Sequence, residues 1–167
     1  GGAIYRVDKY NGAAKVVYQL NGDKYQDGYV PVGGLIYIDG YLYGTTLKGP
    51  RTNALIYPTG SGTVFRFNLQ TNDFDTLHVF SDREVKVTYP SIGNQPVEIK
   101  TSLEGLSPSF SLVNNPGDGY LYGVTNQGGI NGTGVIFRVC KDGVGLVCNH
   151  GLGKAFEVIF NFCLLYT

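Results

Sequence analysis

The sequence of 167 residues has no methionine and no tryptophan, and charged residues make up only 16% of it. Globular domains usually carry about 25% charged residues, and here 13 basic side chains balance 13 acidic ones. This composition argues against a nucleic-acid-binding surface and a polybasic membrane anchor. No apolar run approaches the roughly 20 residues that span a bilayer. Because a translated chain starts with methionine, the start at Gly1 predicts a processed N-terminus or an incomplete sequence, with no signal peptide left to read.

Motifs of catalysis and metal binding are also missing. The chain has no G-x-S-x-G, Walker or Rossmann pattern, and its three cysteines lack the histidine spacing of a zinc site. Asn21-Gly22-Asp23 with Asp27 has the residue types of a calcium loop without its regular spacing, and is interpreted as a turn. Asp73 and Asp75 are predicted to be solvated turn ends rather than a glycosidase pair. We expect no metal and no cofactor, and enzymatic activity stays uncertain, with the sequence leaning against it.

One strand motif occurs three times in this chain of 25 glycines and 13 tyrosines. The copies are G-A-I-Y-R-V at 2–7, G-T-V-F-R-F at 62–67 and G-V-I-F-R-V at 134–139. Each is followed by a turn rich in Asn, Asp and Gly and by a second apolar run, at 14–18, 76–80 and 156–160. Such turns favour hairpins, so the pattern predicts three antiparallel strand pairs.

A second motif, D-G-Y-L-Y-G, begins at Asp39 and again at Asp118. The Asp-Gly step predicts a tight turn, and Tyr-Leu-Tyr-Gly predicts the strand that follows it. Two further hairpins are therefore expected upstream of the second and third strand motifs, at 34–38 with 41–46 and at 109–113 with 120–125.

The repeated unit is thus four short strands, and the chain holds about two and a half units. Four-stranded antiparallel units in series are typical of a β-propeller, whose blades bury their faces against one another. We predict an all-β, β-propeller-like fold with a half blade at 1–20 and a first full blade at 33–81. An inserted hairpin or loop is expected at 82–106, and a second full blade at 107–162 with a cysteine-bearing loop at 140–154. Together these segments form one domain or part of a larger propeller.

The residues of these motifs resemble a known repeat family. Leu42–Thr46 with Gly62–Phe65 read L-Y-G-T-T and G-T-V-F, and Leu121–Thr125 with Gly134–Phe137 repeat them with Val124 and Ile136 substituted. This pattern resembles the GloVer-type tandem repeats of large secreted or surface-exposed proteins. The resemblance implies a propeller scaffold at an extracellular or cell-surface location, and it carries no catalytic residues to this chain.

Three cysteines and one sequon are candidates for covalent modification. Cys140 and Cys148 can lie on the two arms of a hairpin and form a disulfide, or they can be two unpaired strand cysteines. Cys163 is then left over, either free or paired between chains. Asn131 begins a formal N-glycosylation sequon in a predicted loop.

The two histidines are weak site candidates. His78 aligns with Val16 and Val158 of the sister strands, which predicts a packing position between sheets. His150 lies in a glycine-rich loop and is expected to be exposed.

Arginine recurs at one position of the strand motif, as Arg6, Arg66 and Arg138. One interpretation is a ring of guanidinium groups that binds a carboxylate, a glycan or a polymer. The other, which we favour, is that each arginine lays its stem on a neighbouring sheet and satisfies a carbonyl or an aspartate there.

Tyrosines crowd the D-G-Y-L-Y-G hairpins. Tyr41, Tyr43, Tyr120 and Tyr122 can stack on sugars, together with Arg66 and Arg138 as ligand-binding residues. Alternate tyrosines can equally fill the space between blades.

Two and a half blades cannot close a ring, and exposed strand edges template further strands. The sequence therefore predicts a non-enzymatic extracellular structural or adhesive protein that self-assembles through blade or strand complementation, with a filament as one outcome. The alternative is a lectin-like propeller with Tyr-lined carbohydrate sites between blades. The expected partners are other copies of the chain, the missing blades of a longer chain or a glycan. No nucleic acid and no membrane span are expected.

Overall fold

The computed structural model describes residues 1–22, 27–50, 61–80, 84–89, 97–142, 148 and 153–163, and for 84–89 and 97–101 it describes the backbone alone. This part of the chain contains thirteen β-strands and no helix, which confirms the all-β prediction. The strands are β1 (Gly2–Val7), β2 (Ala14–Leu20), β3 (Tyr29–Ile38), β4 (Tyr41–Lys48), β5 (Thr63–Asn68), β6 (Phe74–Val79), β7 (Glu84–Tyr89), β8 (Val97–Ser102), β9 (Leu106–Pro108), β10 (Val113–Asn115), β11 (Tyr120–Gln127), β12 (Val135–Cys140) and β13 (Phe156–Asn161).

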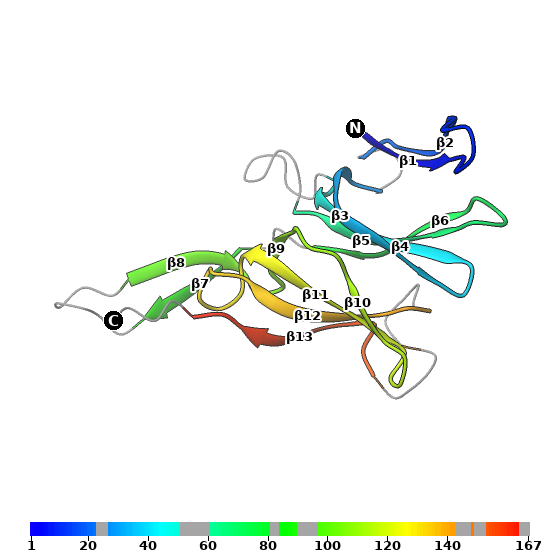
Figure 1. Cartoon of the computed structure of the whole chain (residues 1–167). Coiled ribbons are helices and arrows are strands. Elements are labelled where there is room, and N and C mark those ends of the chain that lie inside the picture. The colour runs from blue at the N-terminus through cyan, green and yellow to red at the C-terminus, as the bar shows by residue number, and fades with distance from the viewer. Residues whose placement is uncertain are drawn as a thin grey trace.

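The strands form four antiparallel sheets. β1 and β2 make the N-terminal hairpin, β3-β4-β5-β6 the middle sheet, and β10-β11-β12-β13 with β9 on β11 the five-stranded C-terminal sheet. β7 and β8 pair as a separate hairpin, which projects to one side of the molecule (Figure 1). The N-terminal hairpin, the middle sheet and the C-terminal sheet follow one another as layers of a stack (Figure 1).

Most predicted strands are confirmed, but the one expected at 109–113 is wrong. The chain instead forms β9 and β10, and residues 109–112 between them are not in a strand. Here the backbone leaves its own sheet and approaches the middle sheet, where the amide N–H of Gly34 donates to Ser111 Oγ at 2.6 Å. The middle sheet has an irregularity at the equivalent place, because the register of β3 against β4 shifts between Val32 and Ile36.

A β-bulge recurs in all three copies of the hairpin that carries the strand motif. The register shifts opposite Ile4/Tyr5, Val64/Phe65 and Ile136/Phe137, so that Val17, Leu77 and Ile159 are the extra residues. A bulge bends its strand and increases its twist. Its recurrence means that the three hairpins share one curvature.

The bulge corrects the alignment of His78. By strand register His78 is equivalent to Tyr18 and Phe160, not to Val16 and Val158, which are equivalent to Thr76. The sequence alignment was wrong by two residues because it began the second apolar run of the middle copy at Thr76, whereas the strand begins at Phe74. Cross-strand partners share a face, so His78 lies on the face of Val64, whereas Thr76, like Val16 and Val158, lies on the opposite face with the aromatic residue of the strand motif. The packing position between sheets is confirmed, because the ring of His78 stacks on Phe156.

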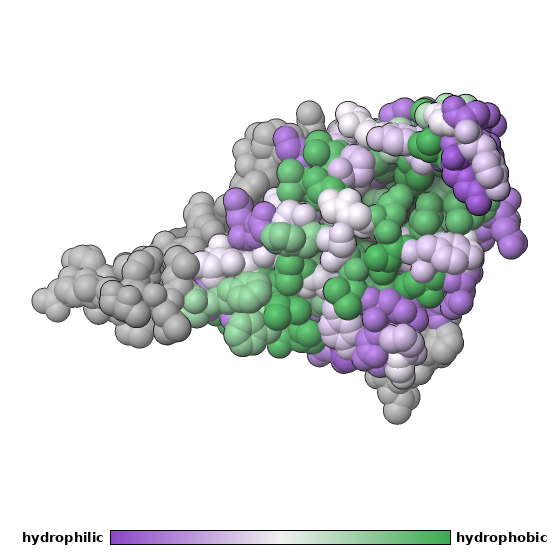
Figure 2. All heavy atoms as spheres, viewed as in Figure 1, coloured by the Kyte–Doolittle hydropathy of each residue, from purple (hydrophilic) through white to green (hydrophobic). Residues whose placement is uncertain are grey.

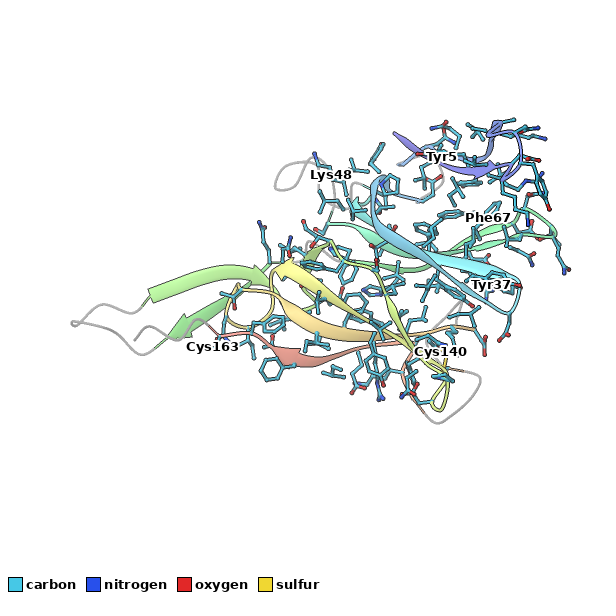
Figure 3. The ribbon with its side chains drawn as sticks, viewed as in Figure 1. Tyr5, Tyr37, Lys48, Phe67, Cys140 and Cys163 are labelled. Atoms are coloured by element: carbon cyan, nitrogen blue, oxygen red, sulfur yellow. A yellow bond between two sulfur atoms is a disulfide. The ribbon has the colours of Figure 1, made fainter. Side chains whose placement is uncertain are left out.

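Each sheet has a leading face toward the preceding layer and a trailing face toward the following layer. Phe65 and Phe67 on the leading face of the middle sheet are fully buried and pack with Ile4 of the N-terminal hairpin. Val64 on its trailing face is fully buried and packs in one cluster with Phe137 of the C-terminal sheet. The middle sheet is therefore apolar on both faces, and Figure 3 shows Phe67 beneath the N-terminal hairpin.

The glycine of D-G-Y-L-Y-G is required by the aromatic residue of the strand motif. Gly44 pairs with Phe65 and Gly123 with Phe137 across neighbouring strands. A Cβ built on Gly44 would lie 2.6 Å from the Phe65 ring, and one on Gly123 would lie still closer to Phe137. The ring therefore lies across the backbone at a place where any side chain would collide with it.

The threonine at the second position after D-G-Y-L-Y-G, Thr46 or Thr125, also has a structural role. Thr46 Oγ1 donates to the carbonyl of Lys48 at 3.0 Å and accepts the amide N–H of Thr63 at 3.1 Å. Thr125 is equally buried and accepts the amide N–H of Val135 at 3.1 Å. Each hydroxyl holds the end of one strand to the start of the next, and its removal would leave a buried N–H without a partner.

We predict that Gly44→Ala and Gly123→Ala each lower the free energy of unfolding by about 1–3 kcal/mol, because the added methyl overpacks against a buried ring. Denaturant unfolding followed by circular dichroism measures the change. Gly117→Ala is the matched control, since the nearest atom to its new Cβ lies 3.7 Å away. Equal stability of all three variants would contradict the role assigned to the ring contact.

Candidate functional site

A pocket of about 310 Å³ lies where the turns of the middle and C-terminal sheets meet. Asp39, Tyr41 and Tyr43 line it from the first D-G-Y-L-Y-G segment, and Asp118 lines it from the second. Lys141, which follows β12, lies on the same rim. The two copies of the motif thus meet at one pocket between two layers of the stack.

The first turn has the backbone that its Asp-Gly step predicts. Asp39 and Gly40 both have positive φ, 49° and 89°, as the central residues of a type I′ turn do. This turn ends β3 and starts β4, and so sets the position of Tyr41 at the rim of the pocket.

Asp118 is held by a set of donors at the second turn. Its carboxylate accepts the Tyr122 hydroxyl at 2.5 Å, the Tyr120 amide N–H at 2.9 Å and the Asn115 side-chain amide at 2.9 Å. These hydrogen bonds lower the pKa of Asp118 below its ordinary value of 3.8, and the bond from Tyr122 has the largest effect. Asp118 is therefore an anion that organises the turn.

Tyr43 presents a buried phenol to this pocket. Its side chain is almost wholly buried, and this burial raises the pKa of Tyr43 above 10.0, while the positive charge of Arg66 opposes the shift. The phenol is therefore protonated at neutral pH, so its hydroxyl can both donate and accept a hydrogen bond in the pocket.

Arg66 joins the two layers behind the pocket. Its Nε lies 2.8 Å from Asp75 Oδ2, its Nη1 donates to the carbonyl of Lys141 at 3.2 Å, and its guanidinium lies 5.0 Å from the centre of the Tyr41 ring. Burial by itself would lower the pKa of Arg66, but the bond to Asp75 outweighs it and the pKa is raised. Asp75 is thus an ion-pair partner, and its prediction as a solvated turn end was wrong.

Arg138 has an equivalent partner on the trailing face of the C-terminal sheet. Its Nη2 lies 2.7 Å from Glu157 Oε2, and its guanidinium lies 4.5 Å from the centre of the Tyr120 ring. The bond to Glu157 raises the pKa of Arg138. Arg6 is exposed and faces Lys15 across the hairpin instead of an acid. These contacts favour the architectural interpretation of the repeated arginine.

The four tyrosines predicted from the motif do not share one site. Tyr41 and Tyr43 line the pocket between the layers. Tyr120 is buried, donates to the carbonyl of Lys154 at 3.0 Å and packs with the Cys140–Cys148 disulfide. Tyr122 lines a shallow apolar depression on the trailing face of the C-terminal sheet. Sequence reasoning missed Lys141, although its place in a turn after the third strand motif marks it as a rim residue.

The predicted disulfide between Cys140 and Cys148 is confirmed, with a Cα–Cα distance of 5.5 Å. Cys163 lies exposed after β13, at the end of the C-terminal sheet far from Cys140 (Figure 3). At the sequon, Asn131 donates from Nδ2 to the carbonyl of Phe162 at 2.8 Å.

His78 lies between the middle and C-terminal sheets. Its ring stacks on Phe156 with centroids 3.5 Å apart and an interplanar angle of 3°, and its Nε2 lies 3.5 Å from Glu104 Oε2. This geometry is that of a packing residue with one polar neighbour. His150 lies outside the described residues.

Asp27 is fully buried and already has partners for its carboxylate. It accepts the Tyr18 hydroxyl at 2.9 Å and the Asn21 amide N–H at 3.0 Å. Asp23, the other carboxylate of the run that resembles a calcium loop, lies outside the described residues. Across the part of the chain that the structure describes, no group of three or more His, Cys, Asp or Glu side chains is placed to hold a metal ion.

We predict that Tyr122→Phe raises the pKa of Asp118, because the hydroxyl that chiefly lowers it is lost. In the native chain the carboxylate stabilises the fold above about pH 3.8, and this contribution is lost as the pH falls through the lower folded-state pKa. NMR titration of the Asp118 carboxyl carbon measures the shift. Tyr10→Phe, whose residue is 86% exposed in the first turn, should leave the titration unchanged. The same Asp118 pKa in both variants would show that the bond is not the cause.

Within the described residues, no helix is long and apolar enough to cross a lipid bilayer. Compared with known proteins, the chain matches no family model, no curated protein and no solved structure.

Proposed function

We propose that this chain is a non-enzymatic structural or adhesive repeat protein that assembles by covering the two open ends of its stack of sheets. The observation that carries this proposal is the contrast between equivalent positions. Phe65 and Phe67 are fully buried on the leading face of the middle sheet, whereas Tyr5 and Val7 at the same places in the N-terminal hairpin are 64% and 55% exposed. The leading face is thus covered in the middle sheet, whereas the equivalent face of the N-terminal hairpin is exposed to solvent.

The other end of the stack is open in the same way. Val113 and Phe160 on the trailing face of the C-terminal sheet are 65% and 54% exposed. Figure 2 shows apolar side chains at the surface over this region, near β13. Exposed apolar faces of this kind mark places where another protein surface binds.

The arrangement supports a propeller as the form of the assembled protein. The middle sheet buries its leading face on the N-terminal hairpin and its trailing face on the C-terminal sheet. Propeller blades pack in this order, with each blade covering the next. The recurring bulge gives the repeated hairpins the same curvature, as identical blades require.

The disulfide supports a location outside the cytoplasm. Disulfides persist in oxidising compartments and are rare in cytosolic proteins. The resemblance of the repeats to those of secreted and surface-exposed proteins agrees with an extracellular or cell-surface site of action.

Three carboxylates near the pocket and on the trailing faces support a structural role over catalysis. Asp118 is held by three donors at its turn, and Asp75 and Glu157 each pair with an arginine. Groups engaged in this way stabilise the folded chain and are poorly suited to exchange protons with a substrate.

Carbohydrate binding is a second candidate function, favoured by the pocket between the layers. It combines the rings of Tyr41 and Tyr43 with the polar side chains of Asp39, Asp118 and Lys141. Sugar sites commonly use an aromatic side chain with polar groups around it. The aromatic ring stacks on the apolar face of the sugar, while the polar groups hydrogen-bond to the hydroxyls at the edge of the sugar.

We predict that purified chain at micromolar concentration forms oligomers or filaments, visible by light scattering after size-exclusion chromatography and by negative-stain electron microscopy. The apolar faces at the ends supply the driving force, because their burial removes exposed Tyr, Val and Phe surface from water. A monodisperse, stable monomer of 18.1 kDa would contradict the proposed function.

We predict that any glycan bound by the chain loses affinity by about tenfold on Tyr41→Ala, because a stacking ring is removed from the pocket. A glycan array identifies the ligand, and calorimetry measures the loss. Tyr37→Ala is the control, since Tyr37 belongs to the same hairpin but is 65% exposed and does not line the pocket. An array without hits would exclude the carbohydrate-binding function.

A further inference from the structure

One open face of the stack is a leading face and the other is a trailing face, and we infer that they bind each other. The trailing face of the C-terminal sheet of one copy covers the leading face of the N-terminal hairpin of a second copy. This inference rests on the proposed function and names the surfaces through which assembly occurs.

The two interfaces inside the chain show how such faces fit together. Between the N-terminal hairpin and the middle sheet, Tyr18 stacks on Phe74 with centroids 4.4 Å apart and an interplanar angle of 9°. Between the middle and C-terminal sheets, His78 stacks on Phe156 at 3.5 Å and 3°. Tyr18 and His78 are equivalent by register, and so are Phe74 and Phe156. One planar contact therefore recurs with the same polarity at both interfaces.

Phe160 occupies the place of Tyr18 and His78 on the open trailing face. It pairs with Ile136 beside the same bulge, and it is 54% exposed. The trailing face of the C-terminal sheet thus presents the ring that a following layer would receive.

The N-terminal hairpin presents the matching receptor. Ala14 stands in register at the place of Phe74 and Phe156, opposite Val7. Val7 and Val16 on the same face are 55% and 54% exposed. A small residue flanked by two exposed valines leaves room for the Phe160 ring of another copy to lie on this face.

A polar contact would accompany the apolar one. Inside the chain, Arg66 donates from the trailing face of the middle sheet to the carbonyl of Lys141 in the turn of the next layer. Arg138 is its equivalent, and its side chain is 30% exposed at the open end. The residue at the place of Lys141 in the N-terminal hairpin is Lys9, so Arg138 can donate to the Lys9 carbonyl of the second copy.

A second copy is the occupant that these faces specify. The open pair repeats an arrangement that the chain itself uses twice, and the two faces lie on opposite sides of the stack (Figure 1). Because the surfaces differ, the contact is head-to-tail, and copies joined in this way form a ring or an open filament according to the rotation between them.

The experiment blocks one face at a time in the full chain. Phe160→Glu places a charge on the trailing face and Val7→Asp places one on the leading face. Both residues are more than half exposed, so the fold should be retained, which circular dichroism verifies. We expect each variant to raise the dissociation constant about 100-fold or more, because a charge would be buried against apolar side chains. Tyr37→Glu is the control and should assemble like the native chain.

Mixing the two variants tests the pairing itself. Each mixture component retains one intact face, so light scattering should show a one-to-one dimer when Phe160→Glu and Val7→Asp are combined at a concentration where each alone is a monomer. A short bismaleimide should also cross-link Ala14→Cys to Phe160→Cys in a Cys163→Ser background, and should not cross-link Tyr37→Cys to Phe160→Cys.

The outcomes separate the two proposals. A native chain that stays monomeric overturns the proposed function and this inference together. Assembly that survives either charged substitution overturns the inference alone, since the copies then meet through other surfaces. A mixture that forms no dimer, or a Val7→Asp variant that dimerises by itself, also overturns the pairing of unlike faces.

Discussion

The close contact between a glycine and a phenylalanine ring on the neighbouring strand is the constraint on which the stack depends. Gly44 with Phe65 and Gly123 with Phe137 place a ring flat over the backbone, on the face that meets the preceding layer. Without a Cβ in the way, the ring fills the space between layers at close packing density. The repeated D-G-Y-L-Y-G is thus mainly a packing device, and the pocket residues are positioned as a consequence of it.

Much of the strand order could be predicted from the sequence, because repetition reveals strands that single-copy patterns leave ambiguous. Each copy of the strand motif supports the others, and the Asn, Asp and Gly residues between them mark the turns. The disulfide could also be predicted, since Cys148 follows Cys140 by eight positions and a hairpin can bring the two together. These features are encoded by residues close to one another in the chain.

Features that depend on contacts between layers could not be predicted in this way. The bulge leaves no local signal at Leu77 or Ile159, so the equivalence of His78 with Phe160 emerged only from strand register. The break between β9 and β10 arises from a bond between Ser111 and Gly34, far apart in the chain. The pocket, likewise, combines two turns that only the stacking of sheets brings together.

A stack whose layers all face the same way has two unlike ends, and this polarity decides how assembly relates to the pocket. Inside the chain the pocket is bounded by two D-G-Y-L-Y-G turns, at Asp39 and Asp118. The N-terminal hairpin has only β1 and β2, so a head-to-tail junction would bring one such turn, not two, to the contact. A pocket at the junction would then be bounded by the Asp118 turn alone, whereas the pocket of Tyr41 and Tyr43 lies between two layers of one copy and stays outside the contact.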